Sequence, residues 1–338
     1  MTHNQVHEVP VVRVVPARRP LFGVWSALRR IGQMDEAGVI GALFVIGLVF
    51  SIFTEHFLQI SNLFQILRQI TLLGIMAVGM TFVMSAGDID LSIGSVFNVS
   101  VISMALVLQS GLQWWIAVPI GLAIGTLCGL INGTLSILLR IPSIIITLAT
   151  LSLYKGVSLL LSGGRAISMF DKENIFFEFG NAKLGPMPAM ILVMLAVVIV
   201  GAVVHRRTVF GRHACAVGSN RKAASYSGIQ VNAVRLRVLT LSGFLVALSA
   251  TLGLAHLASA DPGSGTGYEM DVIAGVIIGG TKFTGGKGTV IGSIVGVAIM
   301  GTMRNGLIML GVSPYWQLVL TGAVIITAVA LDYVLQRR

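Results

Sequence analysis

Long apolar runs separated by short polar stretches cover almost the whole chain. Lys, Arg, Asp and Glu are scarce inside these runs and gather between them. A helix needs about 20 apolar residues to cross the roughly 30 Å hydrocarbon core of a bilayer. The pattern predicts an all-α polytopic membrane protein with about ten transmembrane helices, over residues 37–53, 63–86, 91–110, 114–139, 143–162, 187–204, 238–260, 271–281, 289–310 and 315–334.

The run 271–281 is too short to cross the bilayer as a straight helix. A broken or re-entrant helix buried inside the protein is the alternative, because irregular backbone survives at membrane depth only where protein surrounds it. Eight or nine spans therefore remain possible beside ten.

Composition supports a membrane protein. The chain is 55% hydrophobic and only 11% charged, its mean hydropathy is +0.90, and soluble domains carry roughly 25% charged residues. The net charge of +10 does not indicate a nucleic-acid partner. The basic residues gather in a few polar segments, the positive-inside distribution of proteins whose partner is the lipid bilayer.

The polar segment 205–237, called the basic segment below, contains seven Lys and Arg residues and no Asp or Glu. Such segments stay on the cytoplasmic side. With the Arg-rich tail 1–36 in the cytoplasm, six crossings bring the basic segment to that side. Ten crossings bring Arg337 and Arg338 there. Both termini are therefore predicted to be cytoplasmic.

The chain contains a weak internal repeat. Residues 90–94 (DLSIG) resemble residues 271–275 (DVIAG), and Asn132-Gly133 resembles Asn305-Gly306. Two halves of five spans each would insert with opposite polarity, the inverted 5+5 arrangement of many transporters. Glycines at four-residue spacing indicate close helix packing, and these are Gly121, Gly125, Gly129 and Gly133 in one half and Gly288, Gly292 and Gly296 in the other.

Asp88 and Asp90 lie between the second and third predicted spans. Asp90 is expected to cap the third helix by accepting from backbone N–H groups near Ser92 and Ile93. For Asp88 two roles stay open: it lines a hydrated path or it grips a partner. At the start of the eighth segment, Asp271 is the expected cap rather than Glu269.

Asn132 and Asn305 lie within apolar spans, where a buried amide needs partners. Hydrogen bonding between helices is the first interpretation, and contact with a polar solute is the second. Ser92 and Asn98 add further neutral polar groups. The residues that either line a translocation path or serve the structure are Asp88, Asp90, Ser92, Asn98, Asn132, Glu269, Asp271 and Asn305.

Motifs for catalysis or metal binding are missing from the sequence. The histidines lack metal-ligand spacing. The stretch 279–288 departs from a phosphate-binding loop, because no Ser or Thr follows Lys287, and is expected to be a tight turn between helices. Cys128 and Cys215 are isolated and are expected to be inert. The chain is therefore not expected to be an enzyme or to bind a cofactor.

Five segments in order resemble the membrane permease subunits of bacterial ABC importers, in the ribose/xylose/galactose-type monosaccharide family. The resemblance runs from about residue 40 to 335. Its segments are AGDIDLSIGS (86–95), GLINGTLSILLRIPSIIITLATL (129–151), GRHACAVGSNRKAASYSGI (211–229), GTGYEMDVIAGVIIGGTKFTGGKGTVIGS (265–293) and NGLIMLGVSPYWQLVLTGAVI (305–325).

The resemblance implies a single permease domain over residues 37–335 in the bacterial inner membrane, with a cytoplasmic coupling loop at 205–237. It implies a cytoplasmic ATPase subunit that binds the ATP, a periplasmic sugar-binding protein, and a second permease copy or a related subunit. It also implies a set of residues that couple to the ATPase: Gly211, Gly218, Ser219, Asn220, Arg221, Lys222, Ala223, Ala224 and Gly228. Arg221 and Lys222 would face acidic partners or lipid headgroups.

The sequence departs from the family pattern at Asp88, where a glycine is usual, and at Lys282 and Lys287. Two alternatives remain open. A secondary transporter driven by an ion gradient would need carboxylates at mid-membrane. A related ABC permease for branched-chain amino acids would need a path lining that compensates a zwitterion.

Overall fold

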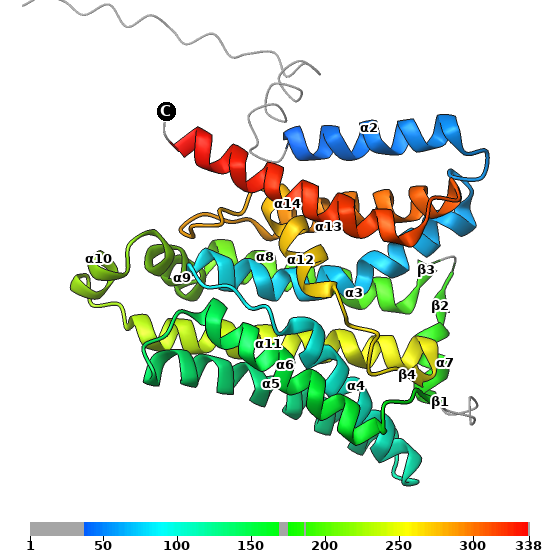
Figure 1. Cartoon of the computed structure of the whole chain (residues 1–338), viewed down its shortest axis with the longest axis horizontal. Coiled ribbons are helices and arrows are strands. Elements are labelled where there is room, and N and C mark those ends of the chain that lie inside the picture. The colour runs from blue at the N-terminus through cyan, green and yellow to red at the C-terminus, as the bar shows by residue number, and fades with distance from the viewer. Residues whose placement is uncertain (1–36, 169–174, 186, 337–338) are drawn as a thin grey trace, which may run out of the picture.

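The computed structural model describes residues 37–168, 175–185 and 187–336, and helices make up most of them (Figure 1). The predicted tail 1–36 and the terminal Arg337 and Arg338 lie outside these residues. The longer helices are α2 (Ala37–Phe53), α3 (Ile60–Ser85), α4 (Ile93–Gln109), α5 (Trp114–Leu138), α6 (Ser143–Ser162), α8 (Ala189–Arg207), α11 (Val231–Leu257), α12 (Tyr268–Ile278), α13 (Val290–Met309) and α14 (Pro314–Gln336).

Each of the ten predicted runs contains one of these helices. Six of the helices, α3, α5, α6, α8, α11 and α13, are long and apolar enough to cross a membrane. Shorter apolar stretches lie in α2, α4 and α14. The remaining helix, α12, has 11 residues and is about 16 Å long at 1.5 Å per residue, as the short run predicted. The protein is therefore a helical, polytopic membrane protein.

The basic segment is not a loop, contrary to the sequence interpretation. Helix α8 continues to Arg207 and α11 already begins at Val231, and between them lie α9 (Val209–Ser219) and α10 (Arg221–Tyr226). Thr208 caps α9 by accepting from the Gly211 N–H, and Asn220 caps α10 by accepting from the Ala223 N–H. These caps fix where α9 and α10 begin.

Short elements complete the far end of the molecule (Figure 1). Helix α7 (Ile175–Asn181) lies there with two antiparallel two-residue pairs. One pair joins β1 (Ile167–Ser168) to β4 (Ser259–Ala260), and the other joins β2 (Lys183–Leu184) to β3 (Met187–Pro188). Helices α9 and α10 lie at the opposite end, together with the end of α14, whereas α2 begins nearer the middle of the long axis (Figure 1).

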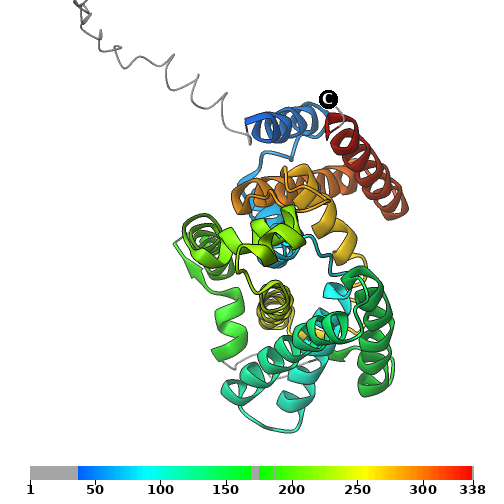
Figure 2. The same cartoon turned by 90° about the vertical axis from the view of Figure 1, so that its left-hand side faces the viewer.

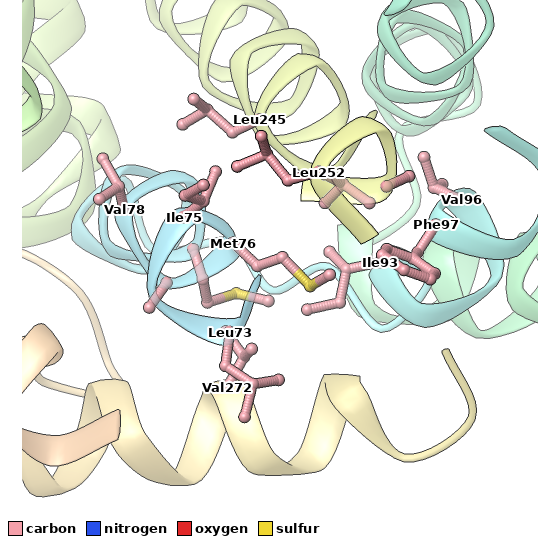
Figure 3. Packing of buried hydrophobic residues seen from close by; sticks show 14 of the residues in the cluster. Leu73, Ile75, Met76, Val78, Ile93, Val96, Phe97, Leu245, Leu252 and Val272 are labelled. Carbon is pink, nitrogen blue, oxygen red and sulfur yellow. The ribbon is translucent and has the colours of Figure 1, made fainter. Parts of the chain in front are cut away.

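Helices α3 and α11 lie at the centre of the bundle (Figure 2). In the most apolar 18-residue stretch of each of these two helices, 78% is buried inside the protein. The corresponding share is 28% in α5, α6 and α8. Side chains from α3, α4, α11 and α12 meet in the core (Figure 3). The residues labelled there are Leu73, Ile75, Met76, Val78, Ile93, Val96, Phe97, Leu245, Leu252 and Val272.

The two halves of the chain pack in the same way around these central helices. Helix α5 packs on α11 as α13 packs on α3, and α4 contacts both α5 and α6 as α12 contacts both α13 and α14. The glycine spacing explains the close approach. A Cβ on Gly129 would collide with the Leu239 carbonyl oxygen of α11, and a Cβ on Gly296 with the Gly275 carbonyl oxygen of α12.

Two helices begin near the middle of the molecule's long axis rather than at an end: α4, after the irregular residues 86–92, and α12, after residues 258–267 (Figure 1). Their starts touch. A Cβ on Gly94 would collide with the Gly265 carbonyl oxygen, and the Gly265 N–H donates to Asn98 Oδ1 over 2.7 Å. Residues 258–267 are thus partly buried.

Candidate functional site

Asp88 is the centre of a charged cluster at the end of the bundle that carries α9 and α10. Its carboxylate receives two hydrogen bonds from Arg235 of α11, Nε to Oδ2 at 2.7 Å and Nη2 to Oδ1 at 2.9 Å. The Ser143 hydroxyl of α6 donates to Oδ1 over 2.9 Å. Only 2% of the Asp88 side chain and 9% of the Arg235 side chain are exposed. A buried carboxylate is tolerable here because a buried cation neutralises it.

Arg221, at the start of α10, binds the same carboxylate. Its Nη2 donates to Asp88 Oδ1 and to the Gly87 carbonyl oxygen, each over 2.9 Å. The Arg221 side chain is 44% exposed. The expectation that Arg221 only faces partners or headgroups is therefore incomplete, because this cation bridges the basic segment to the irregular residues after α3. We call Asp88, Arg221, Arg235 and Ser143 the Asp88 cluster.

Glycines bring three chain segments together beside the Asp88 cluster. Gly218 of α9 packs against the Ser85 carbonyl oxygen, and a Cβ on it would come within 2.6 Å of the Gly286 nitrogen. The Gly286 N–H donates to the Ser85 carbonyl oxygen over 3.0 Å. Gly87 and Gly285, both with positive φ, pack on each other and on Gly218. We call Gly87, Gly218, Gly285 and Gly286 the glycine junction.

The glycine junction joins the basic segment to both halves of the chain. In the first half, Ser85 is the last residue of α3 and Gly87 lies between α3 and α4, and in the second half residues 279–289 connect α12 to α13. This connector is a turn-rich stretch without helix or strand, as the sequence predicted. A displacement of Gly218 would therefore shift the backbone that it contacts after α3 in the first half and after α12 in the second half.

The remaining predicted coupling residues form a small surface around this junction. Gly211 lies against the His205 carbonyl oxygen where α9 begins, and Ala224 is the buried residue of α10, with 5% of it exposed. Gly228 takes a φ of +83°, which favours glycine. The residues that are exposed there are Ser219, Asn220, Arg221, Lys222, Ala223 and Gly228. The structure thus presents them together at one end of the molecule.

Asp90 is buried in a separate polar network. Its Oδ1 accepts from the Ser92 N–H at 3.0 Å and from the Ser92 hydroxyl at 2.6 Å. The Ile93 N–H is not among its donors, so the expected helix cap forms only in part. Asn132 donates to the Ser92 hydroxyl over 2.8 Å and accepts from the Tyr154 hydroxyl over 3.1 Å. The network joins α4, α5 and α6.

Asn305 makes the predicted contact between helices. It exchanges two hydrogen bonds with Asn62 of α3, at 3.1 and 3.0 Å. Asn98 binds the Gly265 N–H, as described above. For Asn132, Asn305 and Asn98 the structure therefore favours a role in holding helices together.

The expectation that Asp271 caps the eighth segment is wrong. Helix α12 begins after Gly267, whose N–H donates to Glu269 Oε1 at 3.3 Å. Asp271 instead accepts from the Thr321 hydroxyl of α14 at 3.2 Å and lies 3.5 Å from Arg304 Nη1 of α13. Its side chain is turned away from the free N–H groups by these partners.

A cavity of about 660 Å³ lies between α3, α12, α13 and α14. Asp271, Arg304 and Thr321 are part of its wall, together with the amides of Gln69 and Gln317. Of the predicted path residues, Asp271 alone lines this cavity. Asp88 and Asp90 lie in the two networks described above.

Sequence reasoning missed Arg235, Ser136, Ser143, Gln69 and Gln317. Arg235 carried a usable signal, because a cation three residues before the apolar run that starts at 238 calls for a buried anion. Its Nη2 also donates to Ser136 at 2.8 Å. The two glutamines carried a similar signal, since each is an amide within an apolar helix.

Within residues 37–168, 175–185 and 187–336, no group of His, Cys, Asp and Glu side chains is arranged to hold a metal ion. His205 of α8 bonds the Ser85 hydroxyl at 2.9 Å and lies 3.9 Å from Cys215 Sγ of α9. Burial raises the pKa of the Cys215 thiol.

Comparison with known proteins places this geometry in context. Residues 62–329 match the family model described as branched-chain amino acid transport system / permease component. The ribose import permease protein of Bacillus subtilis (strain 168) is 40% identical over 303 residues, which are 89% of this chain and 94% of that protein. No solved structure matches the chain.

Two further relatives extend the comparison. The ribose import permease protein of Escherichia coli (strain K12) is 36% identical over 301 residues, 88% of this chain and 94% of that protein. The L-arabinose transport system permease protein of Escherichia coli (strain K12) is 32% identical over 298 residues, 88% of this chain and 90% of that protein.

Proposed function

The chain belongs to the branched-chain amino acid transport system / permease component family, and from its ribose and L-arabinose permease relatives we propose that it carries a monosaccharide or related polyol inward as the translocation subunit of an ATP-driven ABC importer. It is a multi-pass protein of the bacterial inner membrane and a transport subunit rather than an ATPase. The sugar class rests on relatives that import ribose and L-arabinose.

The observation that carries the mechanism is the link of Asp88 to the basic segment. Arg221 belongs to α10 and Arg235 to α11, and both bind the one buried Asp88 carboxylate. A partner that docks on α9 and α10 therefore moves the residues between α3 and α4. We assign the docking surface to the cytoplasmic ATPase subunit, which binds the ATP.

The glycine junction carries the same displacement to the second half, since Gly218 also contacts the connector between α12 and α13. The starts of α4 and α12 meet in the middle of the molecule. Movement of α4 and α12 against each other would open the protein first to one side of the membrane and then to the other. The matching packing of the two halves supports a 5+5 inverted repeat with ten spans.

The orientation follows from charge. The end of α14 and helices α9 and α10 share one end of the molecule, and the basic segment favours the cytoplasm for that end. The other end, with α7, would then receive solute from a periplasmic sugar-binding protein. A second permease copy, identical or related, would complete the conduit.

Reconstitution tests this function directly. The chain is placed in proteoliposomes with its ATPase and sugar-binding protein, and uptake of labelled ribose and L-arabinose is measured with and without ATP. We expect uptake only when ATP and both partners are present. Uptake by the chain alone, driven by a proton or sodium gradient, would contradict the proposal and favour a secondary transporter.

The family description itself favours one second candidate, a permease for branched-chain amino acids. The same vesicles decide between the two. Labelled leucine is offered with a matching binding protein, and unlabelled ribose is added as competitor. Uptake of leucine that ribose does not reduce would support the amino-acid importer instead.

A further inference from the structure

One exposed face of α8 changes from apolar to basic at the end that meets α9. Leu195, Ile199 and Val203 are spaced four residues apart, so they form one stripe along the helix, and all three are exposed. We call these three residues the α8 stripe. Arg206 and Arg207 follow three and four residues after Val203 and continue the same face. Only 28% of the most apolar stretch of α8 is buried, so this face contacts whatever surrounds the protein in the membrane.

A third arginine is folded back onto this end of α8. The chain turns at Thr208, which caps α9, and the turn brings Arg212 of α9 back to the last residue of α8. The Arg212 Nη1 donates to the Arg207 carbonyl oxygen over 3.2 Å. That bond occupies one of the five N–H donors of the guanidinium. We call Arg206, Arg207 and Arg212 the α8 arginine cluster.

The protein does not neutralise the α8 arginine cluster. Within the described part of the chain, the ion pairs involve the carboxylates of Asp88 and Asp271, and none includes an arginine of this cluster. The basic segment itself contains no Asp or Glu, and all three arginines are exposed. Three uncompensated cations at the end of a membrane helix attract anionic groups within about 10 Å of the membrane surface.

The length of the α8 stripe matches one leaflet of a bilayer. From Leu195 to Val203 the helix rises about 12 Å, which is most of the roughly 15 Å that one leaflet contributes to the hydrocarbon core. An acyl chain beside the stripe would place its phosphate at the level of Arg206 and Arg207. An acidic protein surface would complement the arginines but not the apolar residues that lead to them. The combination therefore favours a phospholipid over a protein partner.

We propose that the α8 stripe and the α8 arginine cluster bind an anionic phospholipid of the cytoplasmic leaflet. The phosphate and the charged headgroup lie against the three guanidinium groups, and an acyl chain covers the stripe. The lipid then holds the start of α9, the helix that carries Gly218 of the glycine junction. The proposal goes beyond the transport function and uses only the orientation given above.

Lipid retention by the purified permease tests the proposal. The full chain in detergent is mixed with phosphatidylglycerol or phosphatidylcholine, and retained lipid is counted by native mass spectrometry. We expect one phosphatidylglycerol per chain to be retained and phosphatidylcholine to be lost. Arg206→Gln/Arg207→Gln should weaken the retention of phosphatidylglycerol about thirtyfold, because both arginines contribute to the attraction of the anionic headgroup. A wild-type chain that retains no phosphatidylglycerol would overturn the site.

Arg140→Gln/Arg237→Gln is the matched control. Arg140 lies between α5 and α6, and Arg237 lies near the start of α11, so both are at the same end of the bundle but outside α8. Both are exposed, and the variant loses the same charge as the first one. It should retain phosphatidylglycerol as the wild type does. Equal losses in the two double variants would mean attraction to net charge without a site, and would overturn the proposal.

Two other occupants of this face are outcomes of further measurements. If Arg206→Gln/Arg207→Gln keeps the lipid but no longer co-purifies with the ATPase, the arginines belong to the ATPase docking surface. If Ile199→Cys, in a chain with Cys128 and Cys215 replaced by alanine, forms a disulfide between two copies, the stripe faces the second permease copy. Either result would overturn the lipid site. Lipid retention needs neither sugar nor ATP, so its failure is distinguishable from failure of the importer function.

Discussion

The Arg235 guanidinium of α11 holds the Asp88 carboxylate through two nearly parallel hydrogen bonds, of 2.7 and 2.9 Å. The two residues are 147 positions apart in the chain, and both side chains are almost completely buried. Fixed geometry and burial make such a pair rigid. It anchors the irregular stretch after α3 to the helix that follows the basic segment.

Removal of either Asp88 or Arg235 alone should therefore lower the folding free energy much more than removal of both. Asp88→Asn leaves Arg235 buried without a counter-charge, and we expect a loss of about 3–5 kcal/mol of folding free energy. The double variant Asp88→Asn/Arg235→Met should recover a large part of this loss. Thermal unfolding of the detergent-purified chain measures both, with Asp261→Asn, an exposed carboxylate, as control. Equal losses in the single and double variants would exclude the pairing.

Arg221 and Lys222 are neighbours on α10 but should differ in effect. Arg221 binds Asp88 and is about half exposed, so Arg221→Ala should lower stability by only about 1 kcal/mol or less. It should nevertheless uncouple ATP hydrolysis from ribose uptake, because the link from α10 to residue 88 is lost. Lys222→Ala keeps that link and should retain the ratio of sugar imported to ATP hydrolysed. The same ratio in both variants would count against transmission through Arg221.

Gly218→Ala should disturb the contact between the three segments of the glycine junction. The new methyl group would collide with the Ser85 carbonyl oxygen and come within 2.6 Å of the Gly286 nitrogen. We expect ATPase activity of the assembled transporter to persist while ribose uptake is lost. Gly156→Ala is the control, because nothing lies within 4 Å of the added atom on α6. Normal uptake with Gly218→Ala would show that the contact is dispensable.

Cys215 should react slowly with thiol reagents at neutral pH. Burial raises the pKa of its thiol, so at neutral pH a smaller fraction is the reactive thiolate than at an exposed cysteine. That fraction increases as the pH rises. We expect alkylation by iodoacetamide to be much slower than at an exposed cysteine introduced by Ser225→Cys, and to accelerate with pH over a higher range. The measurement uses mass spectrometry on the full chain with Cys128 replaced by alanine. Equal rates and equal pH profiles at both positions would refute the buried environment.

The positions of the long helices could be predicted from the sequence, because the bilayer imposes a minimum apolar length. All ten predicted runs overlap a helix, and even the shortness of α12 was evident from the short run at residues 271–281. The basic segment was harder to predict. A polar composition does not distinguish a loop from short helices, and the caps at Thr208 and Asn220 decide the matter through local hydrogen bonds.

The candidate site could be predicted only in outline. Asp88 stood out as an extra carboxylate, but its role stayed open because its partners Arg221 and Arg235 are more than 130 residues away. Asp271 looked like a helix cap from its place near the start of a segment. The nearby Arg304 and Thr321, from two other helices, compete for its oxygens in the folded protein.

The sequence by itself determined that this chain enters a membrane and which stretches become helices, since burial of apolar side chains and backbone hydrogen bonding in lipid act locally along the chain. The tertiary structure alone decided which charges meet and which glycines touch. It also decided that Asp271 lies beside Arg304 and Thr321 rather than at a helix start. Those outcomes depend on contacts between distant segments, and the pattern of apolar and polar residues constrains such contacts only weakly.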